Sequence, residues 1–228
     1  MIKNLNWDSD FFGYKVGRID IGNEELPLPQ MDDYKLIYGF SNELIPNWEK
    51  YLYDKKTTYF QDLLDESEFN YTLNITEFQN QKHNYLELLN LAYASGEYSR
   101  FYLDKNFKRQ EFQRLYKRWI DNSIEKVSDY KIFVAEDGEK IIGFITVGKK
   151  NDGLSDIGLL AVSSEARGKR VATQLIQFAK EFSLKHNLNK LQVVTQLDNT
   201  PACKLYEKTG FKIKEINYIY HFWNHDTI

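Results

Sequence analysis

The sequence predicts an α/β protein of the mixed α+β kind, in which a mixed, mostly antiparallel sheet carries helices on both faces. Three observations lead to this fold class. Two helix patterns precede a run of three strand patterns joined by tight turns, which is typical of an antiparallel meander. Alternating helix and strand patterns then follow, and such units place helices against a sheet. A less regular N-terminal segment predicts a small additional α/β domain.

The two helices come first in the predicted main domain, residues 73–228. We expect Thr76 to cap a helix whose apolar face runs from Tyr85 to Tyr93. A polar and aromatic loop, Ser95 to Phe107, follows it. The next helix has the clearest periodicity in the chain, because its apolar residues recur at steps of three and four. These are Phe112, Leu115, Tyr116, Trp119, Ile120 and Ile124.

The sheet strands and the remaining helices follow. Asp137-Gly138 is a strong signal for a two-residue hairpin turn between the first two strands of the meander. We expect a helix that begins after Thr200 as its cap, has Pro201 in its first turn and ends at Gly210. The predicted strands are 131–136, 141–147, 157–162, 191–195, 211–216 and 217–223, and the predicted helices are 168–185 and 201–209.

Residues 1–72 are predicted as a separate N-terminal domain with a structural or substrate-binding role. Alternating apolar residues indicate strands at 16–21 and 34–40, and a helix is expected at 45–53. The boundary near residue 72 precedes the first strongly periodic segment.

Bulk composition narrows the function classes. The chain of 228 residues is 42% hydrophobic, as expected of a globular protein, and its formal charge of −3 argues against a general nucleic-acid binder. A single cysteine, Cys203, excludes an internal disulfide and favours a reducing compartment. The first residues lack a signal core, and no apolar run reaches the roughly 20 residues that span a bilayer. We therefore expect a cytoplasmic protein.

A cationic loop opens the helix at 168–185. It follows a predicted strand and contains Arg167, Gly168, Lys169 and Arg170. Free N–H groups at a helix N-terminus bind anions, and small residues let a phosphate approach the backbone. The loop therefore fits a diphosphate, although a solvated basic turn is an equal alternative. It matches neither the Walker pattern nor the dinucleotide fingerprint.

A second segment, Thr195 to Phe211, adds polar groups at the end of a strand. Asn199 lies where ligands of such sheets bind, and Tyr206 lies about 1.5 turns into the next helix. A phenol at that place can protonate a thiolate leaving group. A lone tyrosine is more often a core or surface aromatic, so this interpretation depends on the two segments together.

Together, the two segments resemble the GCN5-related N-acetyltransferase superfamily over residues 76–228. The resemblance rests on Arg167 to Ala172, and on Asn199, Ala202 and Leu205 to Phe211. Ala172 stands where the family usually has a glycine, and alanine is small enough to keep the assignment. The resemblance implies this superfamily's fold, an acyl-CoA co-substrate (acetyl-CoA or another short acyl-CoA) and no metal. It also implies that Tyr206 protonates the leaving thiolate, and that the cofactor-binding residues are Leu160, Ala161, Val162, Arg167, Gly168, Lys169, Arg170, Val171, Ala172, Thr173, Asn199, Ala202 and Tyr206.

A narrower resemblance covers nearly the whole chain. Asn6 to Gly13, Tyr98 to Phe101, Tyr116 to Asn122 and Thr195-Gln196 are similar to segments of TDP-fucosamine acetyltransferases. That group implies a TDP-linked amino-dideoxy sugar as the acceptor, with the amine position and the acyl length open. The implied substrate-binding residues are Tyr98, Ser99, Arg100, Phe101, Tyr102 and Gln196.

The aromatic loop also supports this acceptor on chemical grounds. We expect Arg100 to contact a diphosphate and the neighbouring aromatic rings to pack on a base or sugar, although a solvated surface arginine is the commoner case. Three carboxylates, Glu97, Asp104 and Asp156, are available as the general base, with proton loss to water as an equal alternative. The histidines show no metal-ligand spacing.

Other functions stay open at this point. One is an acetyltransferase for a protein N-terminus, a lysine or a polyamine. Another is a non-catalytic acyl-CoA sensor. The expected partners are small molecules, with no nucleic acid and no membrane span, and a homodimer is an open alternative.

Overall fold

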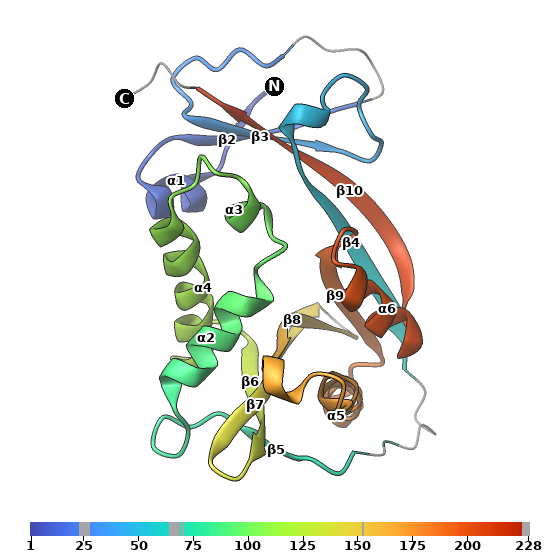
Figure 1. Ribbon diagram of the computed structural model, residues 1–228. Coiled ribbons are helices and arrows are strands. Elements are labelled where there is room, and N and C mark those ends of the chain that lie inside the picture. The colour runs from blue at the N-terminus through green and yellow to red at the C-terminus, as the bar shows by residue number, and fades with distance from the viewer. Residues whose placement is uncertain (23–27, 64–68, 70, 152, 225–228) are drawn as a thin grey trace.

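Ten strands form one continuous sheet in the structure, a computed structural model that describes residues 1–22, 28–63, 69, 71–151 and 153–224. The strands, numbered in chain order, lie in the order β1-β2-β3-β10-β4-β9-β8-β7-β6-β5 (Figure 1). Most neighbours are antiparallel, and the parallel pairs are β2 with β3 and β8 with β9. The predicted mixed, mostly antiparallel sheet is confirmed.

The elements have the following bounds. The strands are β1 (Lys3–Asn4), β2 (Val16–Asp20), β3 (Leu36–Ser41), β4 (Leu52–Asp62), β5 (Asn74–Glu77), β6 (Tyr130–Asp137), β7 (Lys140–Asn151), β8 (Leu154–Val162), β9 (Lys190–Gln196) and β10 (Lys212–Trp223). The α-helices are α1 (Asn6–Phe12), α2 (Tyr85–Ser95), α3 (Arg100–Leu103), α4 (Arg109–Ile124), α5 (Val171–Lys185) and α6 (Thr200–Lys208). Two 3₁₀ turns are η1 (Glu49–Tyr51) and η2 (Ser164–Ala166).

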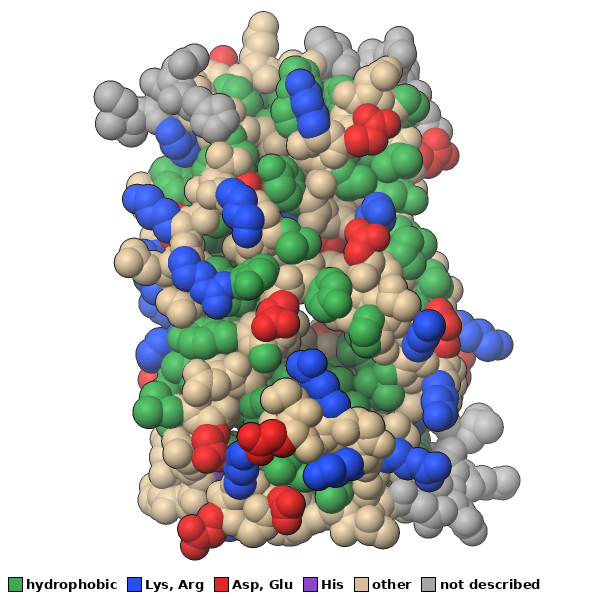
Figure 2. All heavy atoms as spheres, viewed as in Figure 1, with side chains coloured by type: hydrophobic (Ala, Val, Ile, Leu, Met, Phe, Trp, Pro, Cys, Tyr) green, Lys and Arg blue, Asp and Glu red, His purple; other side chains and the backbone are tan. Residues whose placement is uncertain are grey.

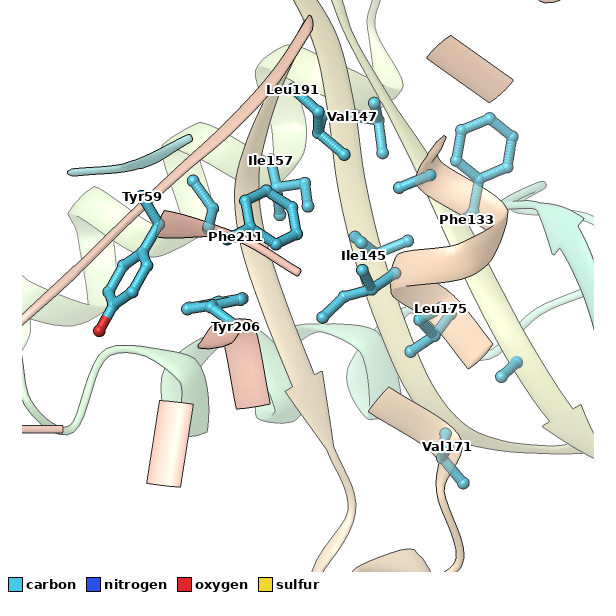
Figure 3. Close-up of a cluster of buried hydrophobic side chains, with 14 of the residues drawn as sticks. Tyr59, Phe133, Ile145, Val147, Ile157, Val171, Leu175, Leu191, Tyr206 and Phe211 are labelled. Carbon is cyan, nitrogen blue, oxygen red and sulfur yellow. The ribbon is translucent and has the colours of Figure 1, made fainter. Parts of the chain in front are cut away.

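Helices cover both faces of the sheet, as the sequence predicts. Side chains alternate between the faces of a strand, so Phe133 and Ile132 of β6 belong to different cores. Phe133 packs in the cluster with Leu175 of α5 and Tyr206 of α6, part of which Figure 3 shows. Ile132 packs in the cluster with Leu88 of α2 and Ile120 of α4 on the opposite face.

The N-terminal strands are part of the same sheet as the C-terminal ones. β4 lies between β9 and β10, so Thr57 faces Thr195 on one side and Ile216 on the other. β3 pairs with the far edge of β10. The division into 1–72 and 73–228 stays a prediction, and the sheet runs across that boundary without a break.

Two local predictions in the first half of the chain are wrong. The helix expected at 45–53 is only the 3₁₀ turn η1 followed by β4, because the chain is already paired as a strand from Leu52, which lies opposite Tyr220 of β10. Thr76 lies in β5 and does not cap a helix. The cap of α2 is Asn84, whose Oδ1 accepts from the Leu86 N–H at 2.9 Å.

Two corrections apply near the C-terminus. The cap of α6 is Asn199, and the predicted cap Thr200 is already helical. The strands expected at 211–216 and 217–223 are one strand, β10, which bends through bulges against β4. Among the described helices, none is long and apolar enough to cross a membrane.

Candidate active site

A gap between two parallel strands forms the centre of the candidate site. β8 and β9 pair only from Leu154 opposite Lys190 to Ile157 opposite Val193. Beyond that point β8 continues to Val162 and β9 to Gln196 without pairing with each other. Backbone N–H and C=O groups on both strands are therefore available to a ligand inserted between them.

A cavity of about 230 Å³ lies where the two strands separate. Residues of helices α2 to α4 line it from one face of the sheet, and residues of α6 line it from the other. Figure 2 shows a hollow near the middle of this side of the molecule. The lining residues are Asp54, Ser95, Ser99, Arg100, Phe101, Tyr116, Trp119, Ile157, Gly158, Leu159, Leu160, Val193, Val194, Thr195, Gln196, Asn199, Ala202 and Tyr206.

The predicted anion site lies at the N-terminus of α5. Gly168 and Arg170 both have a positive φ, 78° and 60°, and this turn directs the chain into the helix at Val171. No side chain caps the helix, so its first N–H groups are open to a ligand. Arg167 and Lys169 are exposed beside them. The helix begins three residues later than predicted, because the loop conformation extends through Arg170.

Tyr206 reaches the cavity from α6. It is 5% exposed, and its ring packs against Tyr59 at 5.6 Å and Phe211 at 5.9 Å between ring centroids (Figure 3). Burial raises the pKa of the Tyr206 phenol well above its ordinary value, and the adjacent Cys203 adds to the shift. The phenol therefore keeps its proton at neutral pH and can act as a donor. Its neighbour Asn199 also lines the cavity while it caps α6.

Arg100 lines the same cavity from α3. Its guanidinium lies over the Tyr38 ring at 4.1 Å, and its Nη1 is 3.4 Å from Nε2 of His221. His221 is buried, and its Nδ1 donates to Asp104 Oδ2 at 2.6 Å. The carboxylate thus fixes the Nδ1–H tautomer and leaves Nε2 to accept from Arg100. The buried pair holds Arg100 in a defined place at the cavity wall.

Asp54 of β4 is a cavity residue that sequence reasoning missed. It is 7% exposed, and its Oδ1 has no hydrogen-bond partner among the described residues. Burial raises the pKa of Asp54 to about 6, although Arg100, Gln196 and Lys56 each lower it. The sequence could reveal a strand here through the run Thr57 to Phe60, but it gives no sign that Asp54 faces a cavity.

The carboxylates named from the sequence do not face the cavity. Asp104 accepts from His221, from Trp223 Nε1 at 2.7 Å and from Asn106. Asp156 accepts from the Tyr130 hydroxyl at 2.5 Å and from Gln192 at 2.6 Å. Glu97 is exposed, and none of the three lines the cavity.

The structure separates the predicted substrate residues into two groups. Ser99, Arg100, Phe101 and Gln196 line the cavity. Tyr98 is 39% exposed and lies outside the lining. Tyr102 also lies outside it, since its ring packs against Phe112 and under Arg109.

The predicted cofactor-binding residues lie in three kinds of place: the cavity wall, the exposed loop before α5 and the hydrophobic core. Leu160, Asn199, Ala202 and Tyr206 line the cavity, and the exposed loop 167–170 lies at the α5 N-terminus. Val171 and Ala161 are core residues, so any contact they make with a ligand is through the backbone. Over the part of the chain that is described, no cluster of side chains could hold a metal ion.

A second pocket adjoins the first one. It encloses about 300 Å³ and shares Trp119, Gly158 and Leu159 with the cavity. Its other lining residues are Asn122, Ser123, Ser128, Tyr130 and Thr146. The combined space offers aromatic surfaces together with amide and hydroxyl groups.

Sequence comparisons identify several related proteins, including named acetyltransferases. The chain is 36% identical over 97 residues to a streptothricin acetyltransferase of Escherichia coli, covering 42% of this chain and 54% of the relative. It is 29% identical over 133 residues to the spore coat polysaccharide biosynthesis protein SpsD of Bacillus subtilis, covering 58% and 45%. A dTDP-fucosamine acetyltransferase of Escherichia coli is 29% identical over 107 residues, covering 46% and 45%. The matches span about half the length of these relatives.

Solved structures show the same fold. A conserved protein of unknown function from Staphylococcus epidermidis matches with a TM-score of 0.62 at 12% identity, covering 92% of this chain and 84% of that one. An acetyltransferase from the GNAT family of Colwellia psychrerythraea matches with a TM-score of 0.55 at 14% identity, covering 83% and 66%. The sequence profile described as "Acetyltransferase (GNAT) family" matches residues 82–211, more than half of the chain. The chain therefore belongs to the GNAT acetyltransferase family.

Proposed function

We propose that the protein transfers an acyl group from an acyl-CoA thioester to the amine of a TDP-linked amino-dideoxy sugar. The main supporting observation is the cavity between the separated strands β8 and β9, with Tyr206 on one side and Arg100 on the other. The thioester arm enters between the strands, and its diphosphate binds at the α5 N-terminus beside Arg167 and Lys169. The sugar amine approaches from the side of α2 to α4.

The transfer is a direct attack of the amine on the thioester. The amine nitrogen forms a bond to the carbonyl carbon, the carbon–sulfur bond breaks, and the Tyr206 phenol gives its proton to the leaving sulfur. Unpaired backbone N–H groups in the gap polarise the carbonyl oxygen. Most of the rate enhancement comes from holding the two substrates in line.

The acceptor assignment depends on Arg100. It is the arginine in the cavity lining, and His221 and Tyr38 hold it in place. A guanidinium suits a diphosphate, since it presents paired donors to phosphate oxygens. The adjoining pocket with Trp119 and Asn122 has room for the base and sugar of a nucleotide. The polysaccharide-biosynthesis and dTDP-fucosamine relatives support a sugar acceptor.

A second candidate acceptor is a cationic amine without a diphosphate. The streptothricin acetyltransferase relative shares the higher identity, 36%, and the buried carboxylate of Asp54 could attract a cation. Arg100 opposes this alternative, because a fixed positive charge repels a polycation.

Turnover with a matched acceptor panel tests the proposal. The panel pairs TDP-linked 3- and 4-amino-dideoxy sugars with the same free sugars, a polyamine and streptothricin, each with acetyl-CoA and a longer acyl-CoA. We expect the TDP-sugar to be preferred, and Arg100→Ala to raise its KM while the KM for acyl-CoA stays constant. Equal turnover of an amine lacking a diphosphate would refute the nucleotide-sugar acceptor. Binding of acyl-CoA with no turnover of any amine would favour a sensor.

A further inference from the structure

We propose that Asp54 accepts the proton that the acceptor's ammonium group loses before it attacks the thioester. This inference rests on the proposed acyl transfer and assigns the general base of that reaction. The assignment gives the N-terminal part of the chain a direct role at the site, because Asp54 comes from β4.

The position of Asp54 follows from how β4 crosses the sheet. The pairing of β4 with β9 ends at Lys56 opposite Gln196, and β4 continues two residues further to Asp54. Asp54 therefore lies beyond the end of β9, where β8 and β9 have already separated. A register shift against β10 follows at once, between Ile219 opposite Asp54 and Tyr220 opposite Leu52. The carboxylate lines the same cavity as Tyr206.

The hydrogen bonding of Asp54 distinguishes it from the other buried carboxylates. Asp104 and Asp156 each accept from several donors, so their oxygens are occupied. In contrast, Asp54 Oδ1 is fully covered and has no partner within the described chain. An unpartnered buried oxygen costs free energy, which a ligand's N–H would recover. A substrate ammonium supplies such a donor.

The groups that face Asp54 leave it ionised but unusually basic at neutral pH. They are Arg100 from α3, Lys56 from β4 itself, Gln196 from β9, Tyr116 from α4 and Asp198 after the end of β9. Burial is the main cause of the raised pKa of about 6, and Asp198 adds to it, whereas Arg100, Gln196 and Lys56 only partly offset it. A base with a pKa near the working pH combines the correct protonation state with a useful driving force.

Two side chains, Asp54 and Tyr206, account for the protons that are moved in the reaction. Asp54 takes one proton from the ammonium, and the freed lone pair attacks the carbonyl carbon. As the carbon–sulfur bond breaks, Tyr206 protonates the sulfur. The second proton of the nitrogen restores the phenol through water, and Asp54 releases its proton to the solvent.

The test compares Asp54→Asn with Asp198→Asn, which removes a nearby exposed carboxylate. With the acceptor that the panel identifies, Asp54→Asn should lower kcat at pH 7 by about 10²-fold or more. Its dissociation constant for acetyl-CoA, measured by calorimetry, should match that of the wild type. The wild-type plot of kcat/KM against pH should bend near 6, and the bend should disappear in Asp54→Asn. Its rate should recover partly at high pH, where the amine is already neutral.

The outcomes separate the two proposals. An unchanged kcat and an unchanged pH profile in Asp54→Asn would overturn the role of Asp54 and leave the acyl transfer standing. A wild type that acylates no amine would refute the transfer itself. Should Asp54→Asn not fold, Asp54→Glu keeps the carboxylate one methylene further out. We expect it to retain the bend near pH 6 at reduced kcat, and loss of the bend would contradict the proposal.

Discussion

Replacing His221 by glutamine should reverse the effect of mild acid on folding stability. Burial lowers the pKa of His221 from 6.5 to about 4, although its bond to Asp104 favours the charged form. As the pH falls, the unfolded chain takes up a proton near 6.5, whereas the folded chain does not until about 4. Stability contributed by this group is therefore present above pH 6.5 and is lost as the pH falls. Glutamine can still donate to Asp104 but does not titrate.

The size of the effect follows from the two pKa values. Between pH 7.5 and 5.0, His221 should remove about 2 kcal/mol from the free energy of unfolding. Asp54 acts in the opposite direction, because its pKa is raised from 3.8 to about 6 and the folded chain takes up its proton first. Over the same interval Asp54 should add about 1.4 kcal/mol. The wild type should thus lose about 0.6 kcal/mol through these two groups, whereas His221→Gln should gain about 1.4 kcal/mol through Asp54 alone.

Urea unfolding followed by tryptophan fluorescence at both pH values measures this difference. The contributions that other titratable groups make to the free energy of unfolding cancel when two variants are compared, provided that these groups do not contact the changed residue. His186→Gln is the matched control, because His186 lies exposed at the end of α5, and it should behave like the wild type. If His221→Gln lost as much stability as the wild type on acidification, His221 would not be the neutral buried group described.

Three further changes test other parts of the structure. Arg170→Glu should weaken acetyl-CoA binding in a calorimetric titration, because it places a carboxylate beside the open N–H groups of α5; equal affinity would make the loop a solvated turn. Asn199→Ala removes the cap of α6 and should lower the unfolding free energy by about 1 kcal/mol, whereas Asn199→Asp should retain most of it. Leu175→Ala, at a fully buried position of α5, should cost about 2–5 kcal/mol in the same assay, and a smaller loss would mean that the core closes around the cavity.

The elements that could be predicted from the sequence are those with a strong local pattern. α4 carries its apolar stripe from Phe112 to Ile120. The hairpin between β6 and β7 is also present, but its turn is Gly138-Glu139, one residue later than predicted, because Asp137 ends β6 opposite Lys140. The loop before α5 could be found for the same reason, since its glycine and cations are adjacent in the chain. Helical periodicity and turn chemistry act over a few residues, so a single sequence contains them.

β4 and Asp54 could not be placed in this way. The partners of β4 are β9 and β10, more than 120 residues later, and no local feature of the segment from 52 to 62 encodes them. For a related reason, the sequence alone leaves Glu97, Asp104 and Asp156 as candidate bases. Whether a carboxylate faces a cavity or is occupied by Trp223 or Tyr130 depends on contacts that only the fold brings together.

The position of β4 links the two parts of the chain more closely than the predicted boundary at residue 72 implies. A sheet built from residues 73–228 alone would have β9 and β10 without the strand that separates them, leaving two rows of unpaired N–H and C=O groups. It would also lack Asp54. Tyr38, against which the Arg100 guanidinium packs, would be missing together with the rest of β3, which pairs with β10. Since the cavity takes Tyr206 from one side of the boundary and Asp54 from the other, both the fold and the proposed proton transfer require the N-terminal strands.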